Sequence, residues 1–482
     1  MSNEAISEAI LLREFTRELH NKNAAVFAGA GLSIAAGYVD WKGLLRDIIT
    51  DLNLDPDQDD DLVTLAQYHC NQTRSKGRLT QTIFDKFRQT HRPTKNHEIL
   101  ARLPIQTYWT TNYDRLLETA LFDAKKVPDV KYSLKQLAVT RLDRDVSVYK
   151  MHGDIEHPGD AVISKDDYES YSTKMGAFVS ALRGDLIEKT FLFLGFSFTD
   201  PNIDYILSRV RVQYGADQRH HYCIQKRVIR EASDSDESFK RKQLKEHYFI
   251  TDLKRFGIQT VLVDQYEDIT TLLNKIAASY KRSSVFISGA AEEYGKHSSH
   301  EAQTFLHDLS RQIASMKNRI ITGFGLGVGS AVINGALAHL DNVGKTISDE
   351  DIVMRPFPQV ATGGTSLPDQ WKAYRQAMIE HAGIGIFVYG NKRDASGAIV
   401  ASSGMQQEFD LSILAGVSPL PIGSTGYMAE VLWNEVWNNF AKYYPGASAD
   451  FKNQFEKLCD PAASLPELAT TVLNLIRILQ AN

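Results

Sequence analysis

Residues 24–33 read AAVFAGAGLS, a short apolar run that leads directly into a glycine-rich turn. The run predicts a buried strand, and the residues after the glycines predict a helix. Because Gly29 and Gly31 have no side chain, backbone N–H groups can approach a phosphate closely there, and the start of the helix favours negative charge. The stretch therefore favours a nucleotide-binding α/β unit, with a purely structural turn as the alternative.

Similar apolar runs recur through the first half of the chain, and helical patterns fall between several of them. Alternation of this kind predicts a largely parallel sheet that is covered by helices. We expect strands at 107–111, 146–151, 190–196, 221–224 and 259–263, and helices at 5–19, 62–71, 79–90 and 113–124. The polar stretches 55–61 and 231–246 are expected to be loops or exposed helix faces.

The pattern restarts after the basic stretch YKRSS at 280–284. The run VFISGAA begins a second α/β unit, with further strands expected at 319–322, 352–355, 384–389 and 417–422. Glycines closely follow most of these runs, and open α/β sheets place ligands at the carboxyl ends of their strands. The sequence thus predicts two fused Rossmann-type domains, residues 1–281 and 282–482, each with its own crevice.

Length and composition narrow the possible functions. The 482 residues suffice for two to three domains, and the net charge of −5 gives no support for nucleic acid or an anionic membrane as a partner. Cys70, Cys223 and Cys459 lie far apart, so they predict neither a zinc ribbon nor a disulfide framework. The longest apolar runs are only as long as strands, and we expect a cytoplasmic protein without a membrane span or signal peptide.

Polar side chains follow three of the predicted strands in the first domain, in TTNYD at 110–114, KMHGD at 150–154 and GFSFTDPN at 195–202. Asn112 and Asp114 can point into one crevice, or they can cap the next helix. His152 is suited to act as a base near neutral pH, with a core histidine as the alternative. In the third motif, Asp200 is a helix-start signal.

Together with GAGLS, and in this order, these motifs resemble those of the sirtuin family of NAD-consuming enzymes over roughly residues 12–275. The resemblance implies a sirtuin-like, Rossmann-type domain with a parallel sheet, with Asn112 and His152 as catalytic residues. It further implies NAD+ contacts from Ala28, Gly29, Ala30, Gly31, Ser33, Thr111, Asp114, Gly153, Gly195 and Ser197.

The chain departs from the sirtuin deacylases in one respect. Those enzymes carry a zinc module built from two C-x-x-C pairs, which this sequence lacks, so we expect no metal. The departure favours hydrolysis of NAD+ to nicotinamide and ADP-ribose, with water as the acceptor. Two alternatives remain open, an NAD-dependent protein deacylase and an NAD or ADP-ribose sensor that does not hydrolyse its ligand.

Glycine-rich turns also mark the second domain, in FISGAA at 286–291, TGFGLGVGS at 322–330 and GMQQE at 404–408. Such turns cradle phosphates through backbone N–H groups. Arg375 and Lys392 suit a phosphate, and Glu408 suits a ribose hydroxyl. Solvated surface positions for the two cations, and a helix-start charge for Glu408, are the alternatives.

This half resembles the SLOG family of Rossmann-like domains, which bind nucleotide-derived ligands. The order of the two domains resembles that of the effector family of the bacterial Thoeris anti-phage system, in which a partner TIR-domain enzyme makes a cyclic ADP-ribose isomer that activates NAD+ depletion. The resemblance implies homotetramers that can stack into filaments. It implies activator contacts from Ser288, Gly289, Gly323, Leu326, Arg375, Lys392, Gly404 and Glu408.

Overall fold

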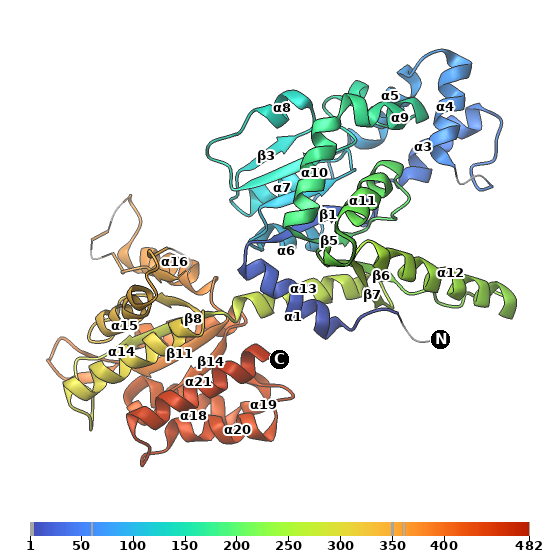
Figure 1. The fold of residues 1–482 in the computed structure, drawn as a ribbon. Coiled ribbons are helices and arrows are strands. Elements are labelled where there is room, and N and C mark those ends of the chain that lie inside the picture. The colour runs from blue at the N-terminus through green and yellow to red at the C-terminus, as the bar shows by residue number, and fades with distance from the viewer. Residues whose placement is uncertain (1–3, 59–60, 349–350, 359, 362, 482) are drawn as a thin grey trace. The chain divides into compact units, whose positions relative to one another are not determined.

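The computed structural model describes residues 4–58, 61–348, 351–358, 360–361 and 363–481 (Figure 1). The chain forms two compact units, Met1–Ala277 and Ala278–Asn482, each built around a parallel sheet. The α/β fold class predicted from the sequence is confirmed. The helix α13 (Glu267–Lys281) runs across the division between the units, close to the predicted boundary at 281–282.

The sheet of the first unit has the strand order β3-β4-β2-β1-β5-β6-β7 and is parallel throughout. The chain moves from β1 to one side of the sheet and later returns to β5 on the other side. Open α/β sheets bind ligands beyond the carboxyl ends of the strands at such a reversal. The strands are β1 (Ala24–Ala28), β2 (Thr107–Thr110), β3 (Pro128–Lys131), β4 (Val146–Lys150), β5 (Thr190–Leu194), β6 (His221–Lys226) and β7 (Ile258–Val263).

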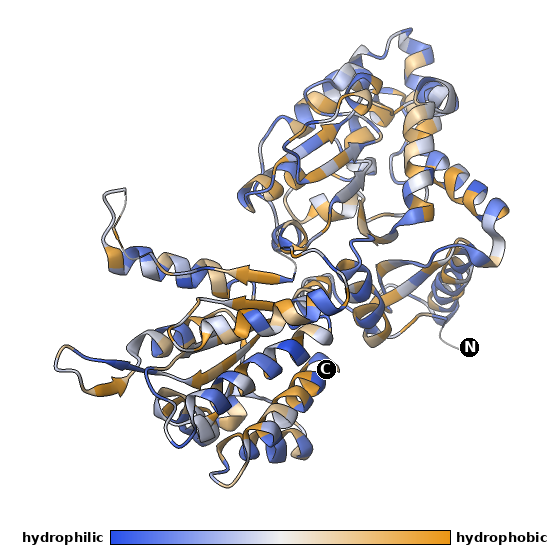
Figure 2. Ribbon diagram, turned by 60° about the vertical axis from the view of Figure 1, so that its left-hand side comes forward, coloured by the Kyte–Doolittle hydropathy of each residue, from blue (hydrophilic) through white to orange (hydrophobic). Residues whose placement is uncertain are grey.

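The central strands form because their residues are apolar on both faces. Every residue of β1, β2 and β5 is buried, as helices on both faces of a parallel sheet require. In Figure 2 several strands are mainly hydrophobic, whereas the helices carry both hydrophobic and hydrophilic residues. The helices are α1 (Glu8–His20), α2 (Ala30–Ile34), α3 (Trp41–Asp51), α4 (Leu62–Thr73), α5 (Gly77–Phe87), α6 (Lys95–Arg102), α7 (Leu116–Asp123), α8 (Leu134–Ala138), α9 (Lys165–Lys174), α10 (Gly176–Glu188), α11 (Pro201–Tyr214) and α12 (Asp236–Arg255).

The second unit also contains a parallel sheet, with the strand order β10-β9-β8-β11-β14. Its strand order reverses at β8, as that of the first sheet does at β1. A small antiparallel pair, β12 and β13, follows β11. The strands are β8 (Ser284–Ala290), β9 (Arg319–Thr322), β10 (Ile352–Met354), β11 (Ile384–Tyr389), β12 (Asn391–Arg393), β13 (Ile399–Ala401) and β14 (Ser418–Pro421). The helices are α14 (Ser299–Ser315), α15 (Gly329–Asn342), α16 (Leu367–Ile379), α17 (Ser403–Leu414), α18 (Tyr427–Asn438), α19 (Phe440–Tyr443), α20 (Ala449–Glu456) and α21 (Leu465–Ala481).

Within the described ranges, no helix has both the length and the apolar character that would let it cross a bilayer.

Candidate functional site

The turns after β1 and β5 lie in direct backbone contact at the switch point of the first sheet. Gly29 N donates to Leu194 O and Gly31 N donates to Gly195 O, both at 2.9 Å. A Cβ on Gly29 would lie 2.4 Å from Gly195 O, and a Cβ on Gly195 would lie 2.2 Å from Leu32 N. Gly195 also has a φ of +62°. These three positions therefore require glycine so that the two turns can approach each other.

This contact shows which backbone groups of the turn are already bonded. The sequence predicts that backbone N–H groups can approach a phosphate at this turn, and the N–H groups of Gly29 and Gly31 themselves are bonded to the neighbouring turn. The helix after the turn, α2, has only five residues, so its dipole is small. The glycines bring the turns together and shape the crevice, and they do not supply these two donors.

Asn112 joins the first turn to the loop after β2. Its Nδ2 donates to Gly29 O at 2.9 Å and to Ser33 Oγ at 3.0 Å. Ser33 Oγ in turn donates to Asp114 Oδ2 at 2.7 Å. Asp114 Oδ1 accepts from Leu116 N at 3.0 Å, so this carboxylate also caps the start of α7. The capping and site interpretations of Asp114 are thus compatible, and Asn112, Ser33 and Asp114 form one hydrogen-bonded group.

His152 lies in the loop after β4 and is 3 % exposed. Its Nε2 is 2.9 Å from Asp200 Oδ2, but it has no aligned hydrogen-bond partner among the described residues. Asp200 Oδ1 accepts from the N–H groups of Asn202 and Ile203 at 2.9 and 3.0 Å. Burial opposes ionisation of Asp200, but the His152 imidazole and these two N–H groups outweigh it and lower the pKa of Asp200.

The loops that carry Asn112 and His152 lie next to each other. Met151 N donates to Thr110 O at 2.9 Å, as an extension of the pairing between β2 and β4. The Trp41 ring, at the start of α3, has its centroid 6.5 Å from the ring of Tyr113 and 6.4 Å from that of His152. The loops of the two predicted catalytic residues are therefore brought to one end of the sheet, where Tyr113 and His152 lie near one indole ring.

A buried lysine that the sequence analysis did not single out ties these loops together. Lys150 Nζ donates to Asp114 O at 2.6 Å and to Tyr113 O at 3.1 Å, and it pairs with Glu118 at 3.1 Å and Asp154 at 2.5 Å. Burial opposes the charge on Lys150, but the two carboxylates outweigh it and raise the pKa of Lys150. In the sequence, the one feature that marks Lys150 is its position two residues before His152.

The remaining predicted NAD+ residues lie around this group. Ala28 O accepts from Thr110 Oγ1 at 2.9 Å, and Gly153 has a φ of +99° in the turn after His152. Ser197 is exposed and shares a 2.7 Å hydrogen bond with Thr199. Ala30 and Thr111 are half-buried.

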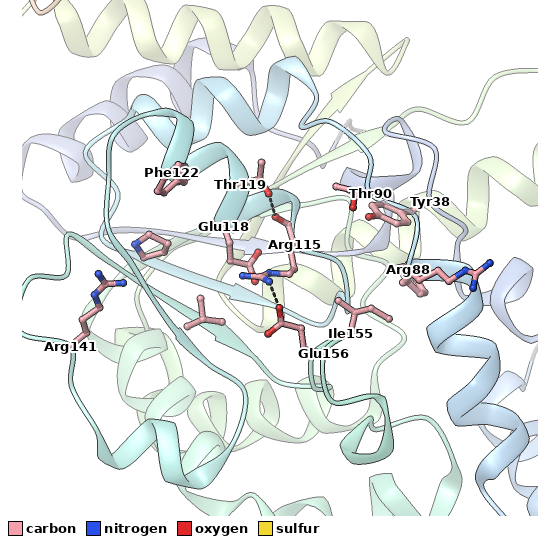
Figure 3. A pocket seen from close by; sticks show the side chains of 13 residues that line it. Tyr38, Arg88, Thr90, Arg115, Glu118, Thr119, Phe122, Arg141, Ile155 and Glu156 are labelled. Atoms are coloured by element: carbon pink, nitrogen blue, oxygen red, sulfur yellow. Dashed lines mark hydrogen bonds and ion pairs between the residues drawn. The ribbon is translucent and has the colours of Figure 1, made fainter.

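A cavity of about 610 Å³ opens beside the site, and neither Asn112 nor His152 lines it (Figure 3). Its wall includes Arg115, which directly precedes α7, Glu118 of α7, and Ile155 and Glu156 of the loop after β4. Arg115 and Glu156 form an ion pair across it. In the part of the chain that the structure describes, no cluster of three or more histidine, cysteine, aspartate or glutamate side chains is arranged to hold a metal ion.

A second polar group lies at the switch point of the second sheet. Ser288 Oγ, on β8, donates to Glu408 Oε2 at 2.6 Å, and Arg375 Nε is 3.4 Å from Glu408 Oε1. Arg375 Nη1 also donates to Gln407 Oε1 at 3.1 Å. Burial raises the pKa of Glu408, although Ser288 and Arg375 oppose this effect. Arg375 and Glu408 are each 9 % exposed, so this pair is largely removed from water.

Of the predicted glycines, Gly404 lies against the Arg375 side chain and Gly323 lies against the aromatic ring next to it. A Cβ on Gly404 would lie 3.0 Å from Arg375 Nη2. The guanidinium lies 4.8 Å from the centroid of the Phe357 ring, and a Cβ on Gly323 would lie 2.8 Å from that same ring. Phe357 was not among the predicted residues, because nothing in its sequence surroundings marks it.

The other predicted activator residues lie in β8, in β12 and in the loop after β9. Gly289 is at the end of β8, where a Cβ would lie 2.8 Å from Val388 Cγ1. Leu326 is 65 % exposed on the loop after β9, and its O accepts from Ala291 N at 2.8 Å. Lys392, exposed on β12, donates to Ser403 Oγ at 3.3 Å. These residues are nearer the surface than Arg375.

Comparisons with known proteins agree with this organisation. Residues 106–253 match the SIR2-like domain family, and residues 268–479 match the Sir2- and TIR-associating SLOG family. The chain is 48 % identical over 471 residues to the NAD(+) hydrolase ThsA of Bacillus cereus (strain MSX-D12), covering 98 % of each chain. It is 44 % identical over 485 residues to that of Cytobacillus dafuensis, covering 99 % of this chain and 98 % of the relative. With that of Acinetobacter baumannii (strain 532279), identity is 42 % over 477 residues, covering 98 % and 99 %.

Proposed function

The chain belongs to the family of NAD(+) hydrolases named ThsA, and from that premise we propose that its first unit hydrolyses NAD+ under the control of a nucleotide bound to its second unit. The products are nicotinamide and ADP-ribose. The activator is a cyclic ADP-ribose isomer. The observation that carries the proposal is the presence of two separate polar groups, each at the switch point of its own parallel sheet.

The chemistry at the first group is cleavage of the bond between the nicotinamide nitrogen and C1′ of the ribose. The bonding electrons leave with nicotinamide, and a water oxygen bonds to C1′ and gives up a proton. His152 acts as the general base for the ribose hydroxyls or for this water, a role that contributes about 10²–10⁴-fold to such rates. Asn112 holds the ribose or the water, and Asp114 lies on the nicotinamide side.

The polar atoms of the site fit a ligand that has many hydrogen-bonding groups. Asn202 Nδ2 is covered and has no hydrogen-bond partner among the described residues. Buried polar atoms are ordinarily paired, so an unpaired one beside Asp200 supports binding of a polar substrate. Because His152 is 3 % exposed, NAD+ reaches it only when neighbouring side chains move.

The second group suits an anionic nucleotide. Arg375 is held between Glu408, Gln407 and the Phe357 ring, so its guanidinium is fixed before a phosphate arrives. Charge-assisted contacts of arginine with phosphate are among the stronger hydrogen bonds. Lys392 and the loop of Leu326 cover the ligand from the exposed side, and Ser288 and Glu408 contact a ribose hydroxyl.

Control by a ligand suits an enzyme that empties a cell of NAD+. A ligand must favour the active arrangement by about 10⁴-fold to shift its population from 1 % to 99 %. We place this control in anti-phage defence, with a TIR-domain enzyme as the source of the activator and a homotetramer, able to stack into filaments, as the responding assembly.

The experiment is to measure nicotinamide release from NAD+ by the purified protein, with and without a panel of cyclic ADP-ribose isomers. We expect release to rise with one isomer and not with linear ADP-ribose. An acetyl-lysine peptide added as co-substrate separates the deacylase alternative, because only a deacylase would transfer the acetyl group. Absence of nicotinamide release under every condition would contradict hydrolysis and leave the sensor alternative.

A further inference from the structure

Asp200 precedes α11 and faces the His152 ring with a carboxylate whose position is fixed. Its Oδ1 accepts from Asn202 N at 2.9 Å and Ile203 N at 3.0 Å, which leaves Oδ2 toward His152 Nε2 at 2.9 Å. We propose that Asp200 is the positioning residue of the hydrolysis, holding the Nε2 side of the imidazole so that Nδ1 serves the ribose or the attacking water. The inference rests on the proposed role of His152 as the base.

The exposure of the ring supports this orientation. Four per cent of the His152 side chain is exposed, but none of that exposure is at Nε2, which is fully covered. Nε2 can therefore not meet a substrate in this arrangement, and Nδ1 is the nitrogen that remains for one. A carboxylate on the far nitrogen fixes the tautomer of a base and stabilises the imidazolium that forms when the base takes a proton.

The contact between the two residues is close but not aligned as a hydrogen bond. Catalytic hydrogen bonds in enzymes without substrate are often misaligned and become shorter and straighter when the substrate is bound. The Tyr168 hydroxyl donates to Asp200 Oδ2 at 3.4 Å, and the Tyr168 ring meets the imidazole edge-on with centroids 5.4 Å apart. A small rotation of the imidazole between these neighbours would complete the pair.

The other titratable groups around the pair keep their charge state over the useful pH range. Burial raises the pKa values of Tyr113, Tyr168 and Tyr171 above the ordinary value, so all three stay neutral. Burial opposes ionisation of Asp167, but Lys76 and nearby N–H groups outweigh it and lower its pKa, so Asp167 stays charged beside Lys76. The neighbouring indole of Trp41 does not titrate. If replacing Asp200 changes how activity depends on pH, the change is therefore due to the His152 imidazole.

A purely structural role for Asp200 would be to cap α11, and asparagine and serine cap helices about as well as aspartate. The variants Asp200→Asn and Asp200→Ser therefore keep the cap and remove the negative charge, and the shorter serine also removes the oxygen that faces His152. Asp61→Asn is the matched control, because Asp61 caps α4 through Thr64 N at 3.1 Å and has no contact with His152.

The test measures nicotinamide release from pH 5 to 9 with the activating isomer present. The proteins compared are the wild type, the three capping variants, His152→Ala and the double variant Asp200→Asn/His152→Ala. We expect both Asp200 variants to lose about 10- to 100-fold in kcat with little change in KM, within the range that a general base contributes. Their acid limb should move to lower pH, because a lost negative charge no longer favours the imidazolium. The double variant should be no slower than His152→Ala alone.

Three results would overturn the inference. One is a kcat of Asp200→Asn within twofold of the wild type, with the acid limb at the wild-type pH, while His152→Ala is slowed by about 100-fold or more. Another is a loss in the double variant that equals the product of the two single losses. The third is a loss of activity that simply follows the folded fraction measured by circular dichroism. Full activity of His152→Ala would instead contradict the proposed base itself.

Discussion

At the scale of single residues, the first site depends on buried charges that are compensated by neighbours from different segments. Lys150 has no exposed surface, and its ammonium group contacts two backbone carbonyls and two carboxylates. A buried charge of this kind is tolerated only when its partners are complete. The same four contacts fix the loop of Asn112 relative to the loop of His152.

Replacing Lys150 by methionine should therefore destabilise the protein and abolish its activity. The change leaves Glu118 and Asp154 buried without their cation, and breaking such a group costs about 3–5 kcal/mol. Urea denaturation measures the loss. The control is Lys95→Met, whose exposed pair with Glu98 is worth about 0–1 kcal/mol. A Lys150→Met variant as stable as this control would contradict the account.

The low pKa of Asp200 predicts a pH-dependent contribution to stability. Because the pKa is lowered in the folded state, the contribution is present above the unfolded value of about 3.9 and is lost as the pH falls below it. The difference in unfolding free energy between wild type and Asp200→Asn should thus be larger at pH 6 than at pH 3. Urea denaturation at both pH values gives the two differences, and equal values would be inconsistent with a depressed pKa.

At the scale of elements, the site depends on how closely two turns approach. Gly195→Ala places a methyl group 2.2 Å from Leu32 N at a φ of +62°, and both the clash and the backbone conformation oppose it. We expect a loss of at least about 2 kcal/mol and greatly weakened NAD+ binding. Gly184→Ala, in the interior of α10 with open space around the new methyl group, should gain about 0.5–1 kcal/mol. Thermal melting of both variants is the measurement, and similar melting temperatures would contradict this assignment.

Most elements could be predicted from the sequence because the central strands are continuous apolar runs. The strands β9 and β11 lie where the runs at 319–322 and 384–389 predicted them. The strand β3 was missed because it is an edge strand in which only the charged residues Asp129 and Lys131 are buried. The exposed pair β12 and β13 was missed since it has few buried residues to mark it.

The sequence predicts only those site residues that belong to a short, continuous motif. GAGLS, TTNYD and KMHGD each place their residues at a strand end, and the topology then brings these ends together. Contacts across long separations were not visible in the sequence. The approach of Asp200 to His152 depends on the position of α11, and that of Phe357 to Arg375 depends on the packing of a loop beside α16.

At the scale of the whole molecule, the two units are separate compact bodies, so control requires a coupling free energy between two sites. Arg375→Ala should leave the first unit unchanged but raise the activator concentration that the response requires, and it should lower the stability of the second unit because Glu408 loses its cation. Loss of a buried, charge-assisted phosphate contact weakens binding of the activator by about 10- to 100-fold. The check is a titration of nicotinamide release with the isomer, and an activation midpoint unchanged from the wild type would exclude Arg375 from the site.

The central claim is that the imidazole of His152 and the amide of Asn112 act on one NAD+ molecule. The most direct test measures NAD+ binding by isothermal calorimetry and nicotinamide release on the same samples. The samples are the wild type, Asn112→Ala and His152→Ala, each in the presence of the activator. We predict that His152→Ala still binds NAD+ but releases nicotinamide about 10²–10⁴-fold more slowly, and that Asn112→Ala binds more weakly and is also slowed. Full nicotinamide release by both folded variants would contradict the account.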